Sequence, residues 1–170
     1  MALPSAENAP CWAVNDCPDW CRRECEAVLR QPAASVGPRP ALRVLVVDDE
    51  ALQRWSACLA LRRAGHQVRL ADSQERAFDI ILDPAGLDLA IVDWRLPQGD
   101  GLDIARLLRR VQPTCTVCLA SFGVTWRLEQ EARAMGAQCL SKPIDAVALA
   151  ARVSQPMNPG PPGLDISPTL

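Results

Sequence analysis

Short apolar runs alternate with longer amphipathic stretches between residues 41 and 153. The runs are rich in Val, Ile and Leu, which is typical of strands buried on both faces of a parallel sheet. Helix signals lie between them, such as Ser73 at a helix start and Gly65 at a helix end. The pattern predicts strands at 42–47, 67–71, 88–92, 115–120 and 138–140, and helices at about 50–64, 73–82, 101–111, 125–135 and 145–153. Five alternating strands and helices imply right-handed crossovers and a doubly wound parallel sheet, which is an α/β fold.

The flanking segments differ from this unit in composition. Residues 1–30 form a Cys-rich N-terminal segment, and residues 31–40 resemble a semi-rigid Pro-rich linker. The regular unit spans 41–153, and the Pro-rich tail at 154–170 is predicted to be disordered. The domain organisation is therefore one α/β unit with two extensions.

Composition and charge exclude several classes of function. The 170 residues are 49% hydrophobic, which is enough for one sizeable core, and the formal net charge is −2. We see no basic patch of the kind that binds nucleic acid, so no nucleic-acid partner is expected. No apolar run has the length of a membrane span and no signal peptide is recognisable, so we expect no membrane partner and a cytoplasmic location.

Charged residues stand where the predicted strands end. Asp48 and Asp49 follow the first strand, Asp93 ends the third, and Lys142 follows the fifth. The carboxyl ends of parallel strands meet at one edge of a sheet, where α/β proteins bind ligands. Crowded carboxylates repel one another unless a cation intervenes, and Mg²⁺ suits such an oxygen-rich site. We therefore predict a magnesium site at this edge.

These motifs resemble the receiver domain of bacterial two-component response regulators, the CheY-like family. The acidic pair after the first strand, Asp93 with Leu96-Pro97 and Gly101 behind it, Ser121 after the fourth strand and Lys142-Pro143 after the fifth stand in the family's order. The resemblance covers 41–153, about two thirds of the chain. It implies a flavodoxin-like sheet with strand order 2-1-3-4-5 and a site at its switch point.

The resemblance also implies roles for particular residues. Asp93 would accept a phosphoryl group from a phosphohistidine of a sensor histidine kinase or phosphotransfer protein. Asp49 and Asp93 would bind Mg²⁺, Asp48 would assist through water, and the backbone carbonyl of Arg95 would complete the protein ligands.

Two further residues would contact the phosphoryl group itself. Lys142 would neutralise its charge, and Ser121 would donate a hydrogen bond to it and move toward it. The implied protein is a phospho-accepting response regulator in a phosphorelay and not a turnover enzyme. We predict no DNA-binding output domain, so the output would be binding of an unknown downstream protein.

Two positions depart from the family pattern. Cys139 stands where an aromatic residue usually reports phosphorylation to the output face. Phe122 stands where a small residue is usual, and its ring is expected to crowd the phosphorylation site.

The N-terminal segment supports a different kind of chemistry. Cys11, Cys17, Cys21 and Cys25 could hold Zn²⁺ or an iron–sulfur cluster, although their spacing departs from the common paired C-x2-C pattern. Thiol redox chemistry and simple packing of a helix face remain open. The alternative function is a pseudo-receiver that serves as a scaffold for this metal- or redox-sensing segment.

A second alternative is a phosphohydrolase that uses Asp93 as a nucleophile and turns over. The D-x-D motif of such enzymes is missing, because Arg95 stands where the second aspartate would be.

Each strand-end residue also has a purely structural interpretation. An aspartate after a strand often caps a helix, a serine often occupies a turn, and a lysine is often a solvated surface residue.

His66 follows Gly65 and is predicted to lie in an exposed loop. Packing roles are predicted for the four cysteines of the regular unit, Cys58, Cys115, Cys118 and Cys139.

Overall fold

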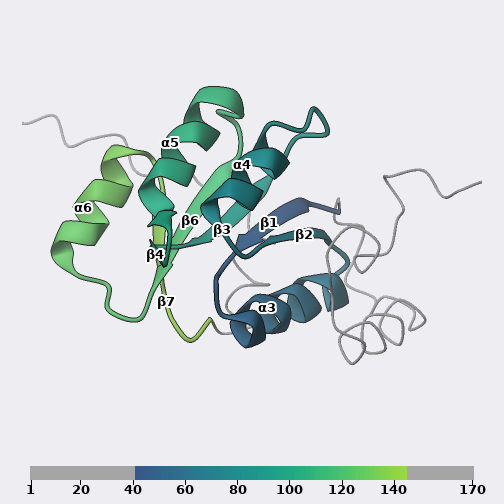
Figure 1. Ribbon diagram of the computed structural model, residues 1–170, viewed down its shortest axis with the longest axis horizontal. Coiled ribbons are helices and arrows are strands. Elements are labelled where there is room, and N and C mark those ends of the chain that lie inside the picture. Colours follow the sequence, from purple (N-terminus) through teal and green to yellow (C-terminus); the bar gives the residue numbers. More distant parts are fainter. Residues whose placement is uncertain (1–40, 145–170) are drawn as a thin grey trace, which may run out of the picture.

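Our computed structural model describes residues 41–144 as a parallel sheet with helices on both faces (Figure 1). The sheet has five strands in the order β2-β1-β3-β6-β7, which confirms the predicted fold class and strand order. Its strands are β1 (Arg43–Val47), β2 (Gln67–Ala71), β3 (Leu89–Asp93), β6 (Thr116–Ser121) and β7 (Gln138–Ser141). The helices are α3 (Ala51–Arg63), α4 (Gln74–Ile81), α5 (Gly101–Val111) and α6 (Trp126–Ala134).

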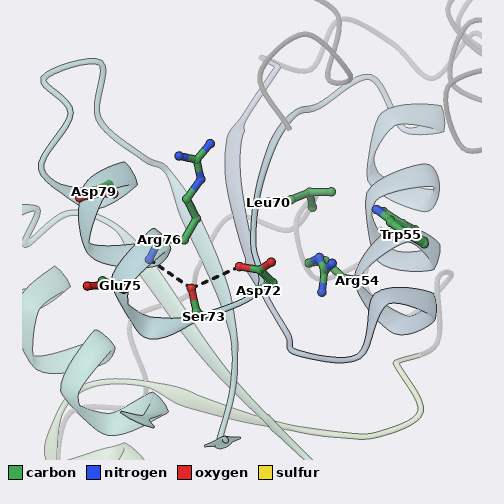
Figure 2. Close-up of a pocket in the computed structure, with 8 residues that line it drawn as sticks. All are labelled: Arg54, Trp55, Leu70, Asp72, Ser73, Glu75, Arg76 and Asp79. Atoms are coloured by element: carbon green, nitrogen blue, oxygen red, sulfur yellow. Dashed lines mark hydrogen bonds between the residues drawn. The ribbon is translucent and has the colours of Figure 1, made fainter. Parts of the chain in front are cut away.

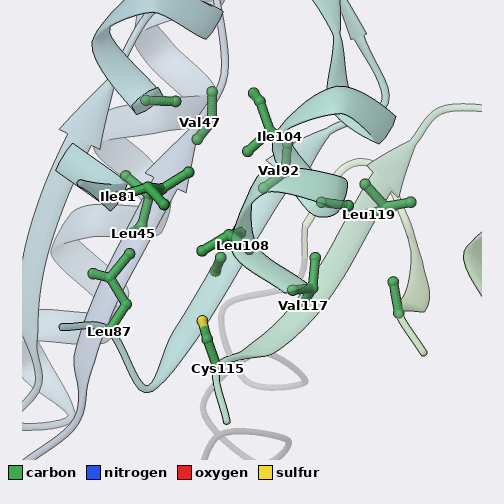
Figure 3. Packing of buried hydrophobic residues seen from close by; sticks show 14 of the residues in the cluster. Leu45, Val47, Ile81, Leu87, Val92, Ile104, Leu108, Cys115, Val117 and Leu119 are labelled. Carbon is green, nitrogen blue, oxygen red and sulfur yellow. The ribbon is translucent and has the colours of Figure 1, made fainter. Parts of the chain in front are cut away.

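Alternation along the strands divides the core into two halves. Val44 and Val46 of β1 face α3, where they pack with Leu61 and other apolar residues. Leu45 and Val47 point to the opposite face, into a larger cluster with residues of α4, α5 and α6 (Figure 3). Because successive strand residues point to opposite faces, a strand that is apolar throughout must be covered on both sides.

Local sequence also fixes where the helices begin. The side chains of Ser73, Asp100 and Thr125 accept hydrogen bonds from backbone N–H groups in the first turns of α4, α5 and α6. Glu50 precedes α3 without such a bond. The ends of the helices thus follow the capping signals closely, within one or two residues of the predicted bounds.

The loop after β3 contains a small hairpin that periodicity did not predict. Strands β4 (Arg95–Leu96) and β5 (Gly99–Asp100) pair antiparallel, and Gly101 then donates its N–H to the Trp94 carbonyl at 3.2 Å. The backbone of the loop therefore returns to the end of β3, directly beside Asp93.

His66 is buried, so its predicted place in an exposed loop was wrong. His66 is 8% exposed, and its Nδ1 accepts a hydrogen bond from the Leu42 N–H at 3.3 Å. The imidazole thus supplies an acceptor for a backbone N–H next to the start of β1. Burial lowers the pKa of His66, since the charged form is disfavoured away from water.

Several predictions fall outside residues 41–144. They concern the Cys-rich segment 1–30 with Cys11, Cys17, Cys21 and Cys25, the linker 31–40, the helix 145–153 and the tail 154–170. None of the helices between residues 41 and 144 has the length and apolar character that crossing a bilayer requires.

Replacing Gly101 with alanine is expected to destabilise the fold. A Cβ at this position would overlap the Asp93 carbonyl oxygen and approach Trp94 Cα to 3.1 Å. We expect Gly101→Ala to lower the free energy of unfolding by about 1–3 kcal/mol in urea titrations. Gly123→Ala is the matched control, because nothing lies within 4 Å of its Cβ position. Equal stability of the two variants would contradict the close approach.

His66 should make the fold less stable in weak acid. A histidine whose pKa is lowered by folding binds more protons when unfolded, so its contribution is full above the unfolded pKa near 6.5 and is lost as pH falls through the folded pKa. The slope cannot exceed about 1.4 kcal/mol per pH unit for one proton. The free energies of unfolding of wild type and of His66→Asn can be measured by denaturant titration from pH 7.5 to 5. The wild-type value minus the variant value should decrease as the pH falls, by no more than this slope. A pH-independent difference would show that His66 does not titrate as stated.

Candidate functional site

The strand order brings the predicted site residues to one edge of the sheet. β1 and β3 are direct neighbours, so Asp48 and Asp49 after β1 lie beside Asp93 at the end of β3. β6 separates β3 from β7, and the Lys142 N–H donates to the Ser121 carbonyl at 2.7 Å where these two strands end. Four strand ends therefore contribute to one cluster.

A buried ammonium joins two of the carboxylates. Lys142 Nζ lies 2.7 Å from Asp48 Oδ2 and 2.6 Å from Asp93 Oδ2. The Lys142 side chain is 1% exposed, which excludes the interpretation as a solvated surface lysine. Its side chain thus crosses the end of β6 to reach residues of β3 and of the loop after β1.

Backbone groups hold the other oxygens of these carboxylates. Asp48 Oδ1 accepts the Glu50 N–H at 2.9 Å, and Asp93 Oδ1 accepts the Arg95 N–H at 3.1 Å. Each carboxylate therefore has one oxygen on the backbone of its own loop and one on Lys142. Arg95 contacts Asp93 through its N–H, and the predicted role of its carbonyl as a metal ligand stays a prediction.

Burial and pairing oppose each other in setting the pKa values here. Burial raises the pKa of Asp48, although its hydrogen bond with Lys142 acts in the other direction. For Lys142, burial alone would lower the pKa, but its hydrogen bonds with Asp48 and Asp93 leave it raised. The ammonium is therefore fully charged at neutral pH.

The remaining charge fits a divalent cation. Asp48, Asp49 and Asp93 each offer an oxygen, and these oxygens lie within 4.8 Å of one another. Three carboxylates and one ammonium sum to a charge of −3 + 1 = −2. Oxygen donors with this charge match the preference of Mg²⁺, whereas zinc usually takes nitrogen and sulfur ligands. The site is an acidic cluster with the composition of a magnesium site.

The Ser121 hydroxyl is engaged within its own turn. Its Oγ lies 3.3 Å from both the N–H and the carbonyl oxygen of Gly123. Phe122, between these residues, is 70% exposed, and its ring centre lies 5.4 Å from Lys142 Nζ. Ser121 thus lies at the predicted strand end, with its hydroxyl bonded to the turn.

Arg54 is a site residue that sequence reasoning missed. Its guanidinium donates to the carbonyl oxygens of Asp48 at 2.6 Å and Asp49 at 3.3 Å, which fixes the acidic loop against α3. Arg54 stands about one helical turn into α3, soon after the acidic pair. This spacing was the sequence signal that could have indicated its contact with the acidic loop.

Arg54 also lines a cavity of about 380 Å³ between α3 and α4 (Figure 2). Trp55 lies on the α3 side, Glu75 and Arg76 lie on the α4 side, and Leu70 of β2 lies between the two helices. This cavity contains neither Asp93 nor Lys142, so it is separate from the acidic cluster.

The cysteines of the described unit behave as apolar residues. Cys58, Cys115 and Cys118 are buried and form no disulfide, and Cys139 is half-buried against the core. Burial raises the pKa of Cys115 to about 12, so this thiol stays protonated at neutral pH. The predicted packing roles fit these observations.

Comparison with known proteins identifies the family. Residues 44–154 match the family model of the response regulator receiver domain. The chain therefore belongs to the response regulator receiver family.

A curated relative agrees with this assignment. The chain is 34% identical over 122 residues to the phosphate regulon transcriptional regulatory protein PhoB of Klebsiella pneumoniae, a match that covers 69% of this chain and 52% of the relative. The chain thus spans about half the length of this curated relative.

Solved structures show the same fold. A CheY-like receiver domain protein from Methanospirillum hungatei superposes with a TM-score of 0.63 at 20% identity, covering 67% of this chain and 91% of that one. The BeF3-activated receiver domain of DrrB gives 0.60 at 22% identity, over 67% and 95% of the two chains.

Magnesium should stabilise the protein through the acidic cluster. A ligand that binds only the folded state adds about 2.7 kcal/mol at one hundred times its Kd. We expect the Tm to rise with Mg²⁺ in wild type and to be insensitive to it in Asp49→Asn, measured by scanning calorimetry.

Asp79→Asn serves as the control, because this exposed aspartate of α4 lies outside the cluster. A loss of the Mg²⁺ response in Asp79→Asn, or its persistence in Asp49→Asn, would place the cation elsewhere.

Proposed function

We propose that this protein is a phospho-accepting response regulator, in which Asp93 receives the phosphoryl group. The observation that carries the proposal is the buried contact of Lys142 Nζ with Asp93 Oδ2 at 2.6 Å, beside the two further carboxylates. A charged ammonium held at the acceptor oxygen is what the transfer of an anionic phosphoryl group requires.

The transfer step forms one bond and breaks another. A carboxylate oxygen of Asp93 attacks phosphorus, and the bond from phosphorus to the donor's leaving atom breaks with its electron pair going to that atom. The product is an acyl phosphate on Asp93. Lys142 moves from pairing with the carboxylates to pairing with the phosphoryl oxygens, a short displacement because it already contacts Asp93.

The acidic cluster would hold Mg²⁺ through Asp48, Asp49 and Asp93, with the Arg95 carbonyl as a further ligand. When bound, the cation supplies positive charge for the phosphoryl oxygens. Charge balance supports this assignment, since the cluster carries two uncompensated negative charges.

Ser121 would act as the switch. To donate to a phosphoryl group on Asp93, its hydroxyl must leave the Gly123 backbone, to which it is bonded at 3.3 Å. Phosphorylation would then rearrange the turn 121–123. This turn leads to α6, so the change reaches a surface beside the site.

The phosphodonor would be a sensor histidine kinase or a phosphotransfer protein, as for receiver domains in general. The output would be a protein target whose binding depends on phosphorylation. The absence of a DNA-binding output stays a prediction, since the curated relative is named a transcriptional regulatory protein and the match covers 52% of it.

The protein would accept the group onto itself and not turn over. Arg95 occupies the position where a phosphohydrolase of the D-x-D type has its second aspartate, and its side chain is exposed. The metal or redox role of the N-terminal cysteines concerns residues outside 41–144.

Incubation with acetyl phosphate and Mg²⁺ should produce a phosphoprotein, detected on a retardation gel and by intact-mass spectrometry. Asp93→Asn should abolish the product, because an amide cannot form the acyl phosphate. Asp103→Asn is the matched control, since this exposed aspartate pairs only with Arg106 among the described contacts. An unmodified wild type with both acetyl phosphate and a cognate kinase would refute the proposal.

A further inference from the structure

The Lys142 ammonium has a third neighbour besides its two carboxylates. An ammonium carries three N–H donors and no acceptor. Asp48 Oδ2 and Asp93 Oδ2 each take one donor. In addition to these ion pairs, the centre of the Phe122 ring lies 5.4 Å from Lys142 Nζ. This distance is within the roughly 6 Å over which the face of an aromatic ring attracts a cation.

The backbone explains why this ring reaches the lysine. Ser121 and Ser141 are paired in the β6–β7 register, and the Lys142 N–H donates to the Ser121 carbonyl. The next residue on the β6 side is Phe122, so its Cα and that of Lys142 leave the sheet side by side. The contact therefore follows from strand register.

Packing does not explain the position of the ring. Phe122 is 70% exposed, and it belongs to neither of the two buried clusters. An apolar ring left in water gains little from burial. Among the contacts described for residues 41–144, the Phe122 ring interacts with the Lys142 ammonium. Truncating the Phe122 side chain would open no cavity in the core.

We propose that Phe122 is a positioning residue that holds the Lys142 ammonium beside Asp93 through the face of its ring. This role rests on the proposed phosphoryl transfer to Asp93. The ring attracts the ammonium without offering a hydrogen-bond acceptor, so it does not compete with the incoming phosphoryl oxygens for the N–H donors. A water molecule in the same place would compete.

The sequence makes the contact directly observable. Lys142 is the only lysine among the 170 residues, so protein labelled with ¹³C and ¹⁵N in lysine gives one side-chain spin system. Ring currents from Phe122 should shift the Lys142 Hε signals upfield. Phe122→Leu keeps an apolar side chain but removes the ring, whereas Phe122→Tyr keeps the ring. Trp126→Leu removes a 75% exposed aromatic residue four positions further along and is the matched control.

We expect the upfield shift in wild type, Phe122→Tyr and Trp126→Leu, and its loss in Phe122→Leu. The rate of Asp93 phosphorylation at saturating acetyl phosphate should fall about two- to five-fold in Phe122→Leu, and Phe122→Tyr should restore it. The Mg²⁺ affinity should stay the same in all variants, since Phe122 contributes no ligand.

Three results would overturn the proposal. They are an unshifted lysine signal in wild type, a Phe122→Leu rate equal to wild type, and a Trp126→Leu rate as low as that of Phe122→Leu. The last would indicate a general effect of exposed aromatic residues on this loop and helix. Failure of the wild type to accept phosphate at all would overturn the proposed function itself, and that outcome is distinct because it precedes any comparison of variants.

Discussion

The buried ammonium between Asp48 and Asp93 is the constraint on which the rest of this site depends. Both carboxylates lie at strand ends, and neither would tolerate burial as an isolated charge. Lys142 reaches them only because β7 ends beside β6 and the two strands are joined by the Ser121 carbonyl. Sheet order, strand register and electrostatics therefore have to agree. Removing one member of such a buried set typically costs about 3–5 kcal/mol, because the charges left behind are unpaired.

The two halves of the core keep this arrangement rigid. Residues of β1 alternate between the α3 face and the face covered by α4 and α5, so sliding this strand by one position would bring the charged Arg43 or Asp48 into the apolar core. The loop after β3 is held in a similar way, since Gly101 lies against the Asp93 backbone and Gln74 accepts the Asp100 N–H. Rigid strands thus carry the carboxylates, while the turn 121–123 contains the hydroxyl that has to move.

Much of the fold followed from periodicity, for a physical reason. Runs such as Leu89–Val92 are apolar at every position, as expected of a strand covered on both faces. The first and third runs are followed by Asp48 and Asp93, charged residues that the apolar core would not accept unpaired. The strand-end logic therefore located Asp48, Asp93 and Lys142, and the structure brings them together. It could not locate contacts that depend on tertiary geometry, such as the Arg54 guanidinium on the acidic loop. The burial of His66 was also not predictable, because its Nδ1 accepts the N–H of Leu42, 24 residues earlier in the chain, and no local pattern reveals that contact.

The placement of Lys142 has a chemical consequence for the whole molecule. Every other basic side chain in the sequence is an arginine, apart from the single histidine, and the side chain of the one lysine is 1% exposed. Reagents that acylate primary amines consequently find no accessible side-chain target on the folded surface. Acylation of Lys142 would mark molecules in which the acidic edge has opened. The rate of slow amine labelling would therefore measure how often the site opens and exposes the lysine.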